Sequence, residues 1–390
     1  MDRQRSGRNT RKLLWLLVTA VVAALALVAA GCGGDDDGGT AAGEGSIWVL
    51  LPDSASSPRW ESDDRRYFDE AFTEAGIEYN IVNAENSATT QQSQAEQAIA
   101  DGASVIVLVS LDTGSGGAII DLAKEAGVQV VEYDRFNTGS SGGAAYVSFD
   151  NVRVGATMAE VLEPAIEALG ADTAQVVELN GGEEDNNAFL FRDGYDATVQ
   201  AHVDDGSWAR VADQHVPGWG ANGEGQTIME QILTDAGNKV DAVFAANDNL
   251  AQQAINALEA AGVGTVPLSG QDASAAGIQN ILLGKQTMTV YKPIEAEAKV
   301  AAAVALALRA GEDLSSVTTD FEFTTIGINS ADGKPTESAE GEGIVPYIAL
   351  VPVGVTIDNI AETVIADGFR TIEEVCAGDT ADTDFCKENS

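Results

Sequence analysis

The stretch Ser269–Ile294, SGQDASAAGIQNILLGKQTMTVYKPI, carries the clearest fold signal in the chain. An apolar run ending in Asp272 and another ending in Lys292 enclose a helical pattern, whose apolar positions are Ala276, Ile278, Ile281 and Leu282. Two strands joined by a helix run parallel, so Asp272 and Lys292 leave from the same carboxyl edge of one sheet. Open α/β sheets bind ligands at that edge. A carboxylate and an ammonium there predict a small polar ligand.

The same alternation of strand and helix runs along the chain from Ser46. Continuous apolar strands between helical patterns predict parallel sheets that are covered by helices on both faces. The strands expected in a first set are Ile47–Leu51, Tyr79–Val82, Val105–Val109, Val128–Tyr133 and Ala145–Phe149. Those expected in a second set are Ala174–Leu179, Arg210–Gln214, Val240–Ala245, Val266–Gly270 and 287–291. Later strands are expected at Thr318–Ile326 and Ile344–Val351, and the last helix at Asp358–Ala366.

The length and the net charge of the chain limit the functions that it can have. The chain has 390 residues, enough for two domains, and 45% of them are apolar, as in a globular protein. Its 61 acidic residues outnumber its 21 basic ones, which gives a formal net charge of −40. Such a surface repels nucleic acid and anionic lipid heads, so no nucleic-acid partner is expected. A general preference for acidic surfaces would explain the charge equally well.

The N-terminus predicts the compartment. A basic segment precedes the 18-residue apolar run Leu13–Ala30, and the residues VAAGC at Val28–Cys32 follow. This resembles the lipobox of bacterial lipoproteins, in which cleavage occurs before the cysteine and its thiol carries lipid; the commonest lipobox has Leu where this chain has Ala29. We expect residues 1–31 to be a signal peptide, Cys32 to be lipid-anchored at the outer face of the cell membrane, and residues 32–45 to be a flexible tether. An uncleaved membrane anchor is the alternative.

The two other cysteines lie near the C-terminus. Cys376 and Cys386 have nine residues between them, which in an exported protein suggests one local disulfide in the tail, residues 376–390. A metal site there is disfavoured, because the only histidines are His202 and His215. No metal and no cofactor are expected.

Polar and aromatic side chains follow the predicted strands at their carboxyl ends, and they come from both halves of the chain. They are Arg59, Trp60, Asp134, Arg135, Asp185, Asn187, Trp219, Asn247, Asp272 and Lys292. Carboxylates and amide oxygens accept hydrogen bonds from hydroxyls, whereas Arg, Lys and amide NH₂ groups donate them. Trp rings cover the apolar C–H faces of a sugar ring. The set predicts a pyranose pocket, while a phosphate pocket would need a Gly-rich turn with a lysine, which Gly114–Gly117 lacks.

Several of these residues have a plain structural interpretation as well. Asn247, Asp248 and Asn249 could cap the following helix. Asp134 and Arg135 could form an ordinary surface pair, and Trp219 could serve packing alone. Asp53 and Asp112 also follow strands and could cap helices, so they are not counted as site residues. The coincidence of the whole set on one edge carries the prediction.

At these residues the chain resembles the D-xylose-binding proteins of bacterial ABC sugar importers, within the ribose/galactose group of type I periplasmic binding proteins. The resemblance runs from Ile47 to Phe369. The matching stretches are Arg59–Trp60, Tyr133–Arg135, Val147–Asn151 (VSFDN), Asp185–Ala188, Phe191–Arg192, Ile228–Glu230, Asn247–Asp248, Ser269–Asp272, Gln286–Ile294 and Val364–Phe369 (VIADGF). The chain departs from the family in its lipobox, its acidity, its C-terminal cysteines and the segment after Val211, around Trp219.

The resemblance implies an α/β type I periplasmic-binding-protein fold, in which two doubly wound parallel-sheet domains are joined by a three-segment hinge. Crossings are expected near Phe149–Asn151, Tyr291–Pro293 and Val351–Gly354. The N-terminal lobe would comprise residues 46–149 and 293–351, and the C-terminal lobe residues 150–292 and 352–375. Eight of the ten residues match positions that hydrogen-bond the sugar, and Trp60 and Trp219 match aromatic residues that flank its ring.

The resemblance implies a monomeric, non-enzymatic receptor that captures D-xylose or a related pentose or hexose by hinge closure and delivers it to an ABC permease, and the lipobox adds the expectation that this receptor is a lipoprotein. Three alternatives share the fold or the residue types. A glycoside hydrolase could use Asp134, Asp185 and Asp272, but Arg135 and Lys292 are expected to keep these acids ionised. The effector domain of a repressor would need a basic helix-turn-helix beside it, but the only basic N-terminal segment of this chain precedes a hydrophobic export signal. A receptor that presents sugar to a membrane signalling protein would use the same pocket.

Overall fold

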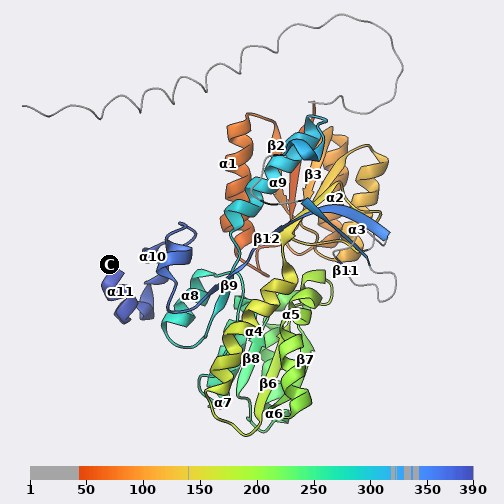
Figure 1. Cartoon of the computed structure of the whole chain (residues 1–390). Helices are drawn as coiled ribbons and strands as arrows, with labels where there is room; N and C mark the ends of the chain where they lie inside the picture. The colour runs from red at the N-terminus through yellow and green to blue at the C-terminus, as the bar shows by residue number, and fades with distance from the viewer. Residues whose placement is uncertain are drawn as a thin grey trace, which may run out of the picture. The chain divides into compact units, whose positions relative to one another are not determined.

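A computed structural model of the chain describes residues 44–138, 140–317, 321, 323–328, 335–336 and 342–389 (Figure 1). The predicted signal peptide, Cys32 and nearly all of the predicted tether lie outside the described residues. Within these described ranges, no helix is both long and apolar enough to cross a membrane.

The larger sheet has the strand order β11-β10-β12-β5-β4-β3-β1-β2. Its neighbours pair in parallel from β12 to β2, whereas β10 and β11 are antiparallel additions at one edge. The strands are β1 (Ser46–Leu51), β2 (Tyr79–Asn83), β3 (Ala103–Leu108), β4 (Gln129–Tyr133), β5 (Ala145–Phe149), β10 (Phe323–Ile328), β11 (Pro335–Thr336) and β12 (Glu342–Leu350). We call this sheet and its helices the first lobe.

Helices cover both faces of this sheet (Figure 1). Helices α1 (Arg65–Ala75) and α9 (Ile294–Arg309) pack on one face, and α2 (Ala88–Ala100) and α3 (Thr113–Glu125) on the other. Successive side chains of a strand point to opposite faces. Ile47 and Val49 therefore join the core under α1 and α9, while Trp48 joins the core under α2 and α3. Burial on both faces explains why these strands read as unbroken apolar runs.

The second lobe is built on the parallel sheet β7-β6-β8. Its strands are β6 (Ala174–Asn180), β7 (Trp208–His215) and β8 (Ala242–Ala245), and its helices are α4 (Asn151–Glu167), α5 (Asn186–Asp205), α6 (Glu224–Asp235), α7 (Asp248–Ala261) and α8 (Ala275–Leu282). Short helices complete the chain at η1 (Trp60–Asp64), η2 (Pro217–Gly220), η3 (Leu314–Ser316), η4 (Ala361–Ile365) and η5 (Gly378–Asp382).

The prediction of a regular strand at Val266–Gly270 is wrong. Only single parallel bridges occur there, Val243 with Leu268 and Gln271 with Val290. Pro267 has no N–H to donate to a ladder, and the chain turns away at Asp272, whose φ is 97°. The segment still runs parallel between β8 and β9 (Thr289–Tyr291), so Asp272 and Lys292 do leave at the same edge.

The chain passes between the lobes three times. It leaves the larger sheet from β5 into α4, returns from β9 into α9, and leaves again from β12 into β13 (Val353–Val355), which pairs antiparallel with β9. These passages fall at the three expected crossings. The predicted fold class is therefore correct, while the residue bounds of the two lobes remain a prediction.

The C-terminal tail has more structure than the sequence indicated. The α-helices α10 (Ile372–Val375) and α11 (Asp384–Asn389), with η5 between them, follow η4, so the expected last helix at Asp358–Ala366 is not the last. Cys376 and Cys386 form a disulfide, with their Cα atoms 5.5 Å apart. The bridge closes a small loop between α10 and α11.

Two glycines bring α4 and α5 into close contact. A Cβ atom on Gly155 would lie 1.9 Å from the carbonyl oxygen of Phe191, and one on Gly194 would lie 2.2 Å from the carbonyl oxygen of Val152. These distances are shorter than any real Cβ contact, so only glycine permits this approach of the two backbones.

We expect the substitution Gly194→Ala to lower the free energy of unfolding by about 1–3 kcal/mol, because the added methyl group forces α4 and α5 apart. Urea unfolding followed by circular dichroism measures the change. The matched control is Gly114→Ala in α3, where the nearest atom is a side-chain oxygen at 3.3 Å. It should leave stability unchanged or raise it slightly. Equal stability of the two variants would contradict the packing described.

Candidate ligand-binding site

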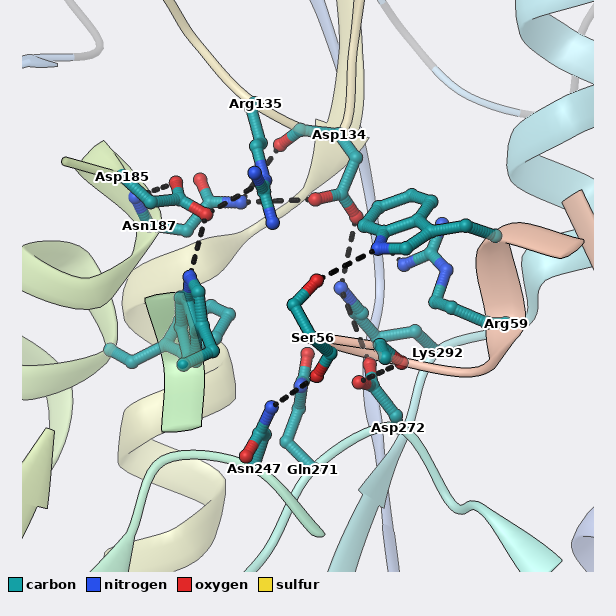
Figure 2. A pocket seen from close by; sticks show the side chains of 14 residues that line it. Ser56, Arg59, Asp134, Arg135, Asp185, Asn187, Asn247, Gln271, Asp272 and Lys292 are labelled. Atoms are coloured by element: carbon teal, nitrogen blue, oxygen red, sulfur yellow. Dashed lines mark hydrogen bonds and ion pairs between the residues drawn. The ribbon is translucent and has the colours of Figure 1, made fainter. Parts of the chain in front are cut away.

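One pocket is lined by all ten residues that the sequence predicts for a site (Figure 2). Each of the ten has an exposed fraction of 7% or less. The cavity volume is about 30 Å³, well below the range of about 300–1,000 Å³ for small-molecule sites, because the lining side chains contact one another in this arrangement. Its lining also includes Ser56, Ser57, Phe191 and Gln271.

Asp134 lies at the centre of the charges. It follows β4 with a φ of 62°, a left-handed conformation that turns its side chain out of the strand direction. Its Oδ2 accepts hydrogen bonds from Arg59 Nη1 at 2.8 Å and from Lys292 Nζ at 3.0 Å. Burial would raise the pKa of Asp134, but Lys292, Arg59 and Arg135 outweigh burial and hold the pKa well below its usual value. Asp134 is therefore ionised.

Arg59 is held by three acidic side chains. Its Nε and Nη2 donate to both oxygens of Asp64 at 2.9 and 2.7 Å, and Nη2 also donates to Glu297 at 2.9 Å. With Asp134 on Nη1, four of its five N–H groups have acceptors among the described residues. Burial alone would lower the pKa of Arg59, but the carboxylates raise it well above its usual value. Its guanidinium carbon lies 4.3 Å from the centroid of the Trp60 ring.

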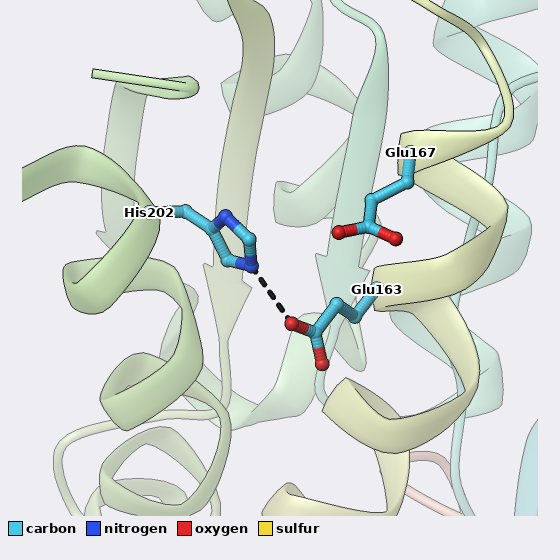
Figure 3. Close-up of side chains that lie close together, drawn as sticks. All are labelled: Glu163, Glu167 and His202. Carbon is cyan, nitrogen blue, oxygen red and sulfur yellow. Dashed lines mark hydrogen bonds and ion pairs between the residues drawn. The ribbon is translucent and has the colours of Figure 1, made fainter. Parts of the chain in front are cut away.

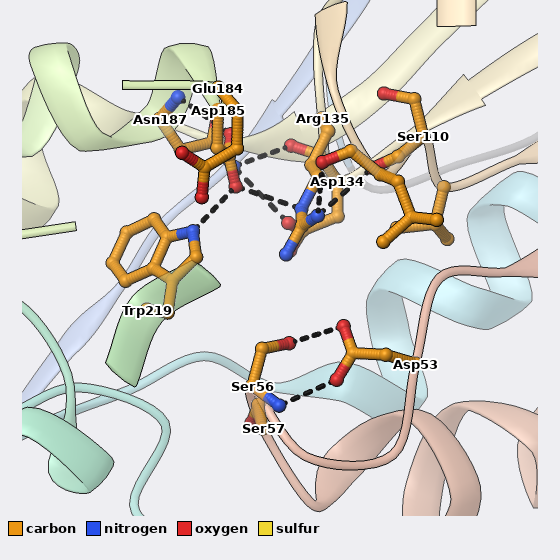
Figure 4. Close-up of polar contacts among 12 residues, drawn as sticks. Asp53, Ser56, Ser57, Ser110, Asp134, Arg135, Glu184, Asp185, Asn187 and Trp219 are labelled. Carbon is orange, nitrogen blue, oxygen red and sulfur yellow. Dashed lines mark hydrogen bonds and ion pairs between the residues drawn. The ribbon is translucent and has the colours of Figure 1, made fainter. Parts of the chain in front are cut away.

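Residues from both lobes meet at Arg135 (Figure 4). Its Nε lies 2.8 Å from Asp185 Oδ2, and its Nη1 donates to the carbonyl oxygen of Ser110 at 2.9 Å. Asp185 also caps α5, because its Oδ1 accepts from the backbone N–H of Asn187. Trp219 Nε1 donates to Asp185 Oδ2 at 3.1 Å, so this tryptophan is fixed by a polar contact as well as by packing.

Asn187 and Asp272 make further contacts between the lobes. Asn187 Nδ2 donates to the carbonyl oxygen of Asp134 at 2.9 Å and to its Oδ1 at 3.2 Å. Asp272 Oδ2 accepts from Ser57 Oγ at 2.8 Å, and its Oδ1 lies 3.8 Å from Lys292 Nζ. A buried carboxylate, Asp248, accepts from the backbone N–H and hydroxyl of Ser274 and so fixes the turn that carries Asp272.

The capping alternatives resolve differently for each residue. Asn247 caps α7 through its Oδ1, while its Nδ2 donates to the carbonyl oxygen of Ser56 at 3.3 Å, so it serves both the helix and the pocket wall. Asn249 does not cap, because its Nδ2 donates to the carbonyl oxygen of Trp219. Asp112 caps α3, whereas Asp53 binds Ser56 and shapes the loop before η1.

Four lining residues were not predicted as site residues. Ser56 and Ser57 lie in a loop without periodicity, and Phe191 is indistinguishable in the sequence from a core residue of α5. Gln271 is the most informative of the four, because its Oε1 is buried without a hydrogen-bond partner among the described residues. Its place directly before Asp272, at the carboxyl edge, was a usable signal.

A salt bridge also joins the lobes outside the pocket lining. Arg370 Nη1 lies 3.3 Å from Asp63 Oδ1, and Arg370 Nε donates to the carbonyl oxygen of Ala273 at 3.0 Å. Asp63 belongs to η1 in the first lobe, and Ala273 follows Asp272 in the second. Arg370 thus links the helical turn that carries Trp60 to the turn that carries Asp272.

The site is poorly suited to acid catalysis. Asp134 is kept ionised as expected, while at Asp185 burial raises the pKa more than Arg135 lowers it. Both Asp185 oxygens nevertheless face donors, from the Asn187 backbone, Trp219 and Arg135. A general acid must present a proton to its substrate, and neither carboxylate is arranged to do so.

A buried acid beside Arg59 predicts a pH dependence. Burial raises the pKa of Glu297 from 4.5 to about 8, although Arg59 lowers it. The folded state therefore holds a proton that the unfolded state releases between these values, so stability falls as the pH rises through this window. Glu297→Gln cannot ionise, so we expect this variant not to lose stability over that pH window. The free energies of unfolding of variant and wild type should be similar at pH 4.5. At pH 8.5 the variant should be more stable than wild type by on the order of a few kcal/mol.

Chemical denaturation at both pH values measures this difference. A matched control is the exposed Glu230→Gln in α6, for which the difference from wild type should not change with pH. If Glu297→Gln lost stability relative to wild type as the pH rose, Glu297 would act as an ionised partner of Arg59, against the prediction.

Comparison with known proteins agrees with this geometry. Residues 48–313 match the family model described as a periplasmic binding protein domain. The D-xylose-binding periplasmic proteins of Escherichia coli and Haemophilus influenzae are each 36% identical to the chain, over 83% and 84% of it and over 90% and 91% of their own lengths. The crystal structure of an ABC transporter solute-binding protein from Clostridium phytofermentans with bound β-D-glucose has a TM-score of 0.73, is 27% identical, and covers 85% of this chain and 99% of its own. The chain therefore belongs to the periplasmic binding protein family, with the type I fold.

Proposed function

We propose that the protein is an extracytoplasmic receptor that captures one monosaccharide, D-xylose, between its lobes and delivers it to an ABC permease. In this proposal Cys32 carries the lipid that anchors it to the outer face of the cell membrane. The observation that carries the proposal is the pocket itself, in which ten predicted residues from both lobes surround one small space. The importer role is supported by the xylose-binding and solute-binding relatives.

The charges of the pocket favour a neutral ligand. Three cations, Arg59, Arg135 and Lys292, and three carboxylates, Asp134, Asp185 and Asp272, line it. Each of these cations already contacts a carboxylate before any ligand arrives. An anionic or cationic ligand would leave a buried charge uncompensated, which is costly. A neutral molecule with hydroxyl groups would not.

The hydrogen-bonding capacity that remains suits a polyol. Lys292 uses one of three N–H groups in a hydrogen bond, and Arg135 Nη2 and one N–H of Arg59 have no acceptor among the described residues. Gln271 Oε1 is a buried acceptor without a donor. A sugar hydroxyl both donates and accepts, so it can satisfy groups of both kinds. Trp60, Trp219 and Phe191 supply the aromatic surface for the C–H faces of the ring.

Hinge closure follows from the distribution of these residues. In the proposed division, the first lobe comprises residues 46–149 and 293–351 and supplies Arg59 and Asp134, while the second comprises 150–292 and 352–375 and supplies Asp185 and Asp272. A ligand that bonds both sets stabilises the closed arrangement through contacts that an open one lacks. We choose xylose because the relatives named for it are 36% identical, whereas the structure that holds glucose is 27% identical.

A thermal-shift screen across pentoses and hexoses tests the ligand class. We expect xylose at 100 times its Kd to add about 2.7 kcal/mol of stability, because it binds only the folded protein. Asp272→Ala should weaken xylose binding by roughly 2–5 kcal/mol, since it leaves Ser57 without its acceptor and removes one of the two carboxylates that face Lys292. The control, Asp358→Ala, removes an exposed carboxylate and should bind like wild type. Unchanged xylose affinity in Asp272→Ala, measured by calorimetry, would contradict the site assignment.

A second substitution tests closure separately from sugar contacts. Asp63→Asn removes the charge that faces Arg370 but no residue of the pocket lining. We expect this substitution to lower the affinity for each bound sugar about fivefold, and by the same factor for all of them. The reason is that the substitution destabilises the closed arrangement of the lobes by about 1 kcal/mol. Calorimetry with two sugars measures the factor. A change in the ratio of the two affinities would show that Asp63 acts on selectivity instead. The control, Asp101→Asn on the exposed surface, should change neither the affinities nor their ratio.

A further inference from the structure

We propose that Glu163 and Glu167 of α4 and His202 of α5 form a binding site for one divalent transition-metal ion of the Zn²⁺ type (Figure 3). Each side chain offers one ligand atom, and these atoms lie within 4.8 Å of one another. His202 Nε2 is 2.8 Å from Glu163 Oε1. The sequence did not predict this site, because the three residues form no recognisable motif.

The packing of the two helices sets the spacing of the cluster. Gly155 and Gly194, where the backbones of α4 and α5 approach most closely, precede Glu163 and His202 by eight residues each. Eight residues make about 2.2 helical turns, so each ligand lies roughly 80° around its helix from the glycine and still on the side near the neighbouring helix. Glu167 lies one turn beyond Glu163 on that face. The backbone contact thus holds the ligands in register.

The contacts of His202 suit a metal ligand. Its Nδ1 lies 2.8 Å from Ser207 Oγ, and its Nε2 lies 2.8 Å from Glu163 Oε1. Without a metal ion, a proton joins Nε2 to the carboxylate. When Nδ1 holds the imidazole proton instead, Nε2 has a lone pair for a metal ion, and the metal ion takes the place of the shared proton.

The surroundings also orient the imidazole. Its ring stacks on Trp208, with centroids 4.1 Å apart and an interplanar angle of 13°. An imidazole that donates its second N–H to a fixed acceptor is the usual arrangement of a metal-binding histidine. The two glutamates, one turn apart, repel each other when both are ionised, and a divalent cation removes that repulsion.

The ligand types indicate the class of metal. One imidazole nitrogen and two carboxylate oxygens suit Zn²⁺ and its neighbours in the first transition row better than Ca²⁺, which prefers oxygen ligands only. Tetrahedral bonds of about 2.0–2.1 Å place ligand atoms roughly 3.3 Å apart. Glu167 is exposed and free to approach by the small distance required. Water would occupy the fourth position.

The site is separate from the sugar pocket. Asn187, in the pocket, and His202 are fifteen residues apart on α5, which corresponds to roughly 22 Å along the helix. A metal ion would join α4 to α5 within the second lobe and raise its stability by binding only the folded state. This inference does not depend on the nature of the sugar.

Calorimetry on the chelator-treated, tag-free protein tests the proposal with Zn²⁺ as the probe. We expect one Zn²⁺ to bind per chain and to raise the melting temperature. His202→Gln and Glu167→Gln should each weaken binding at least tenfold. Co²⁺ should give a visible absorption band that His202→Gln abolishes. The matched control is Asp204→Asn, which removes an exposed charge from α5 close to His202 and should bind Zn²⁺ like wild type.

The outcomes separate a built site from general attraction to an acidic surface. If Zn²⁺ binding were weak and unsaturable, or if Asp204→Asn reduced it as much as Glu167→Gln, the acidic surface alone would be responsible and the proposal would fail. Glu167 is exposed, so its substitution does not threaten folding. The Glu167→Gln result therefore stands even if His202→Gln is unstable.

Discussion

The ionised carboxylate of Asp134 is the contact on which the binding site depends. It accepts from Arg59 in the first lobe and from Lys292, at the passage between β9 and α9, while its carbonyl oxygen accepts from Asn187 in the second lobe. Buried cations need a paired anion, because the desolvation of an unpaired charge costs several kcal/mol. Asp134 meets that need for two of the three cations in the pocket. Its left-handed backbone conformation is what lets one residue at the end of a strand face all three groups.

The topology of a parallel sheet explains why so much of the site could be predicted from the sequence. Strands joined by helices all end at the same edge of their sheet, so Asp185 and Asp272 had to lie at the carboxyl edge in the second lobe and Asp134 at the carboxyl edge in the first. The apolar runs and helical spacing were enough to locate those ends. The regularity of Val266–Gly270 was overestimated, but its parallel direction was correct, and only direction matters for the position of Asp272.

The sequence could not show which polar groups would be left without partners. Ser57 and Gln271 line the pocket because of what surrounds them after folding: Ser57 reaches Asp272 from the other lobe, and the Gln271 oxygen is buried without a donor among the described residues. Nor could it show that burial would outweigh Arg135 at Asp185. The cluster of Glu163, Glu167 and His202 depends on the contact of two helices, which local patterns do not encode. Such properties are set by tertiary packing.

The pairing of every cation in the pocket with a carboxylate has a consequence for the medium in which the protein works. Dissolved salt screens interactions between exposed charges but reaches buried pairs much less. An uncharged ligand that enters this cavity displaces no counterions, so the ionic strength has little effect on its binding affinity. The dense negative exterior meanwhile keeps individual molecules apart at high protein concentration. Such a receptor would bind its ligand with the same affinity at low and at high salt concentration.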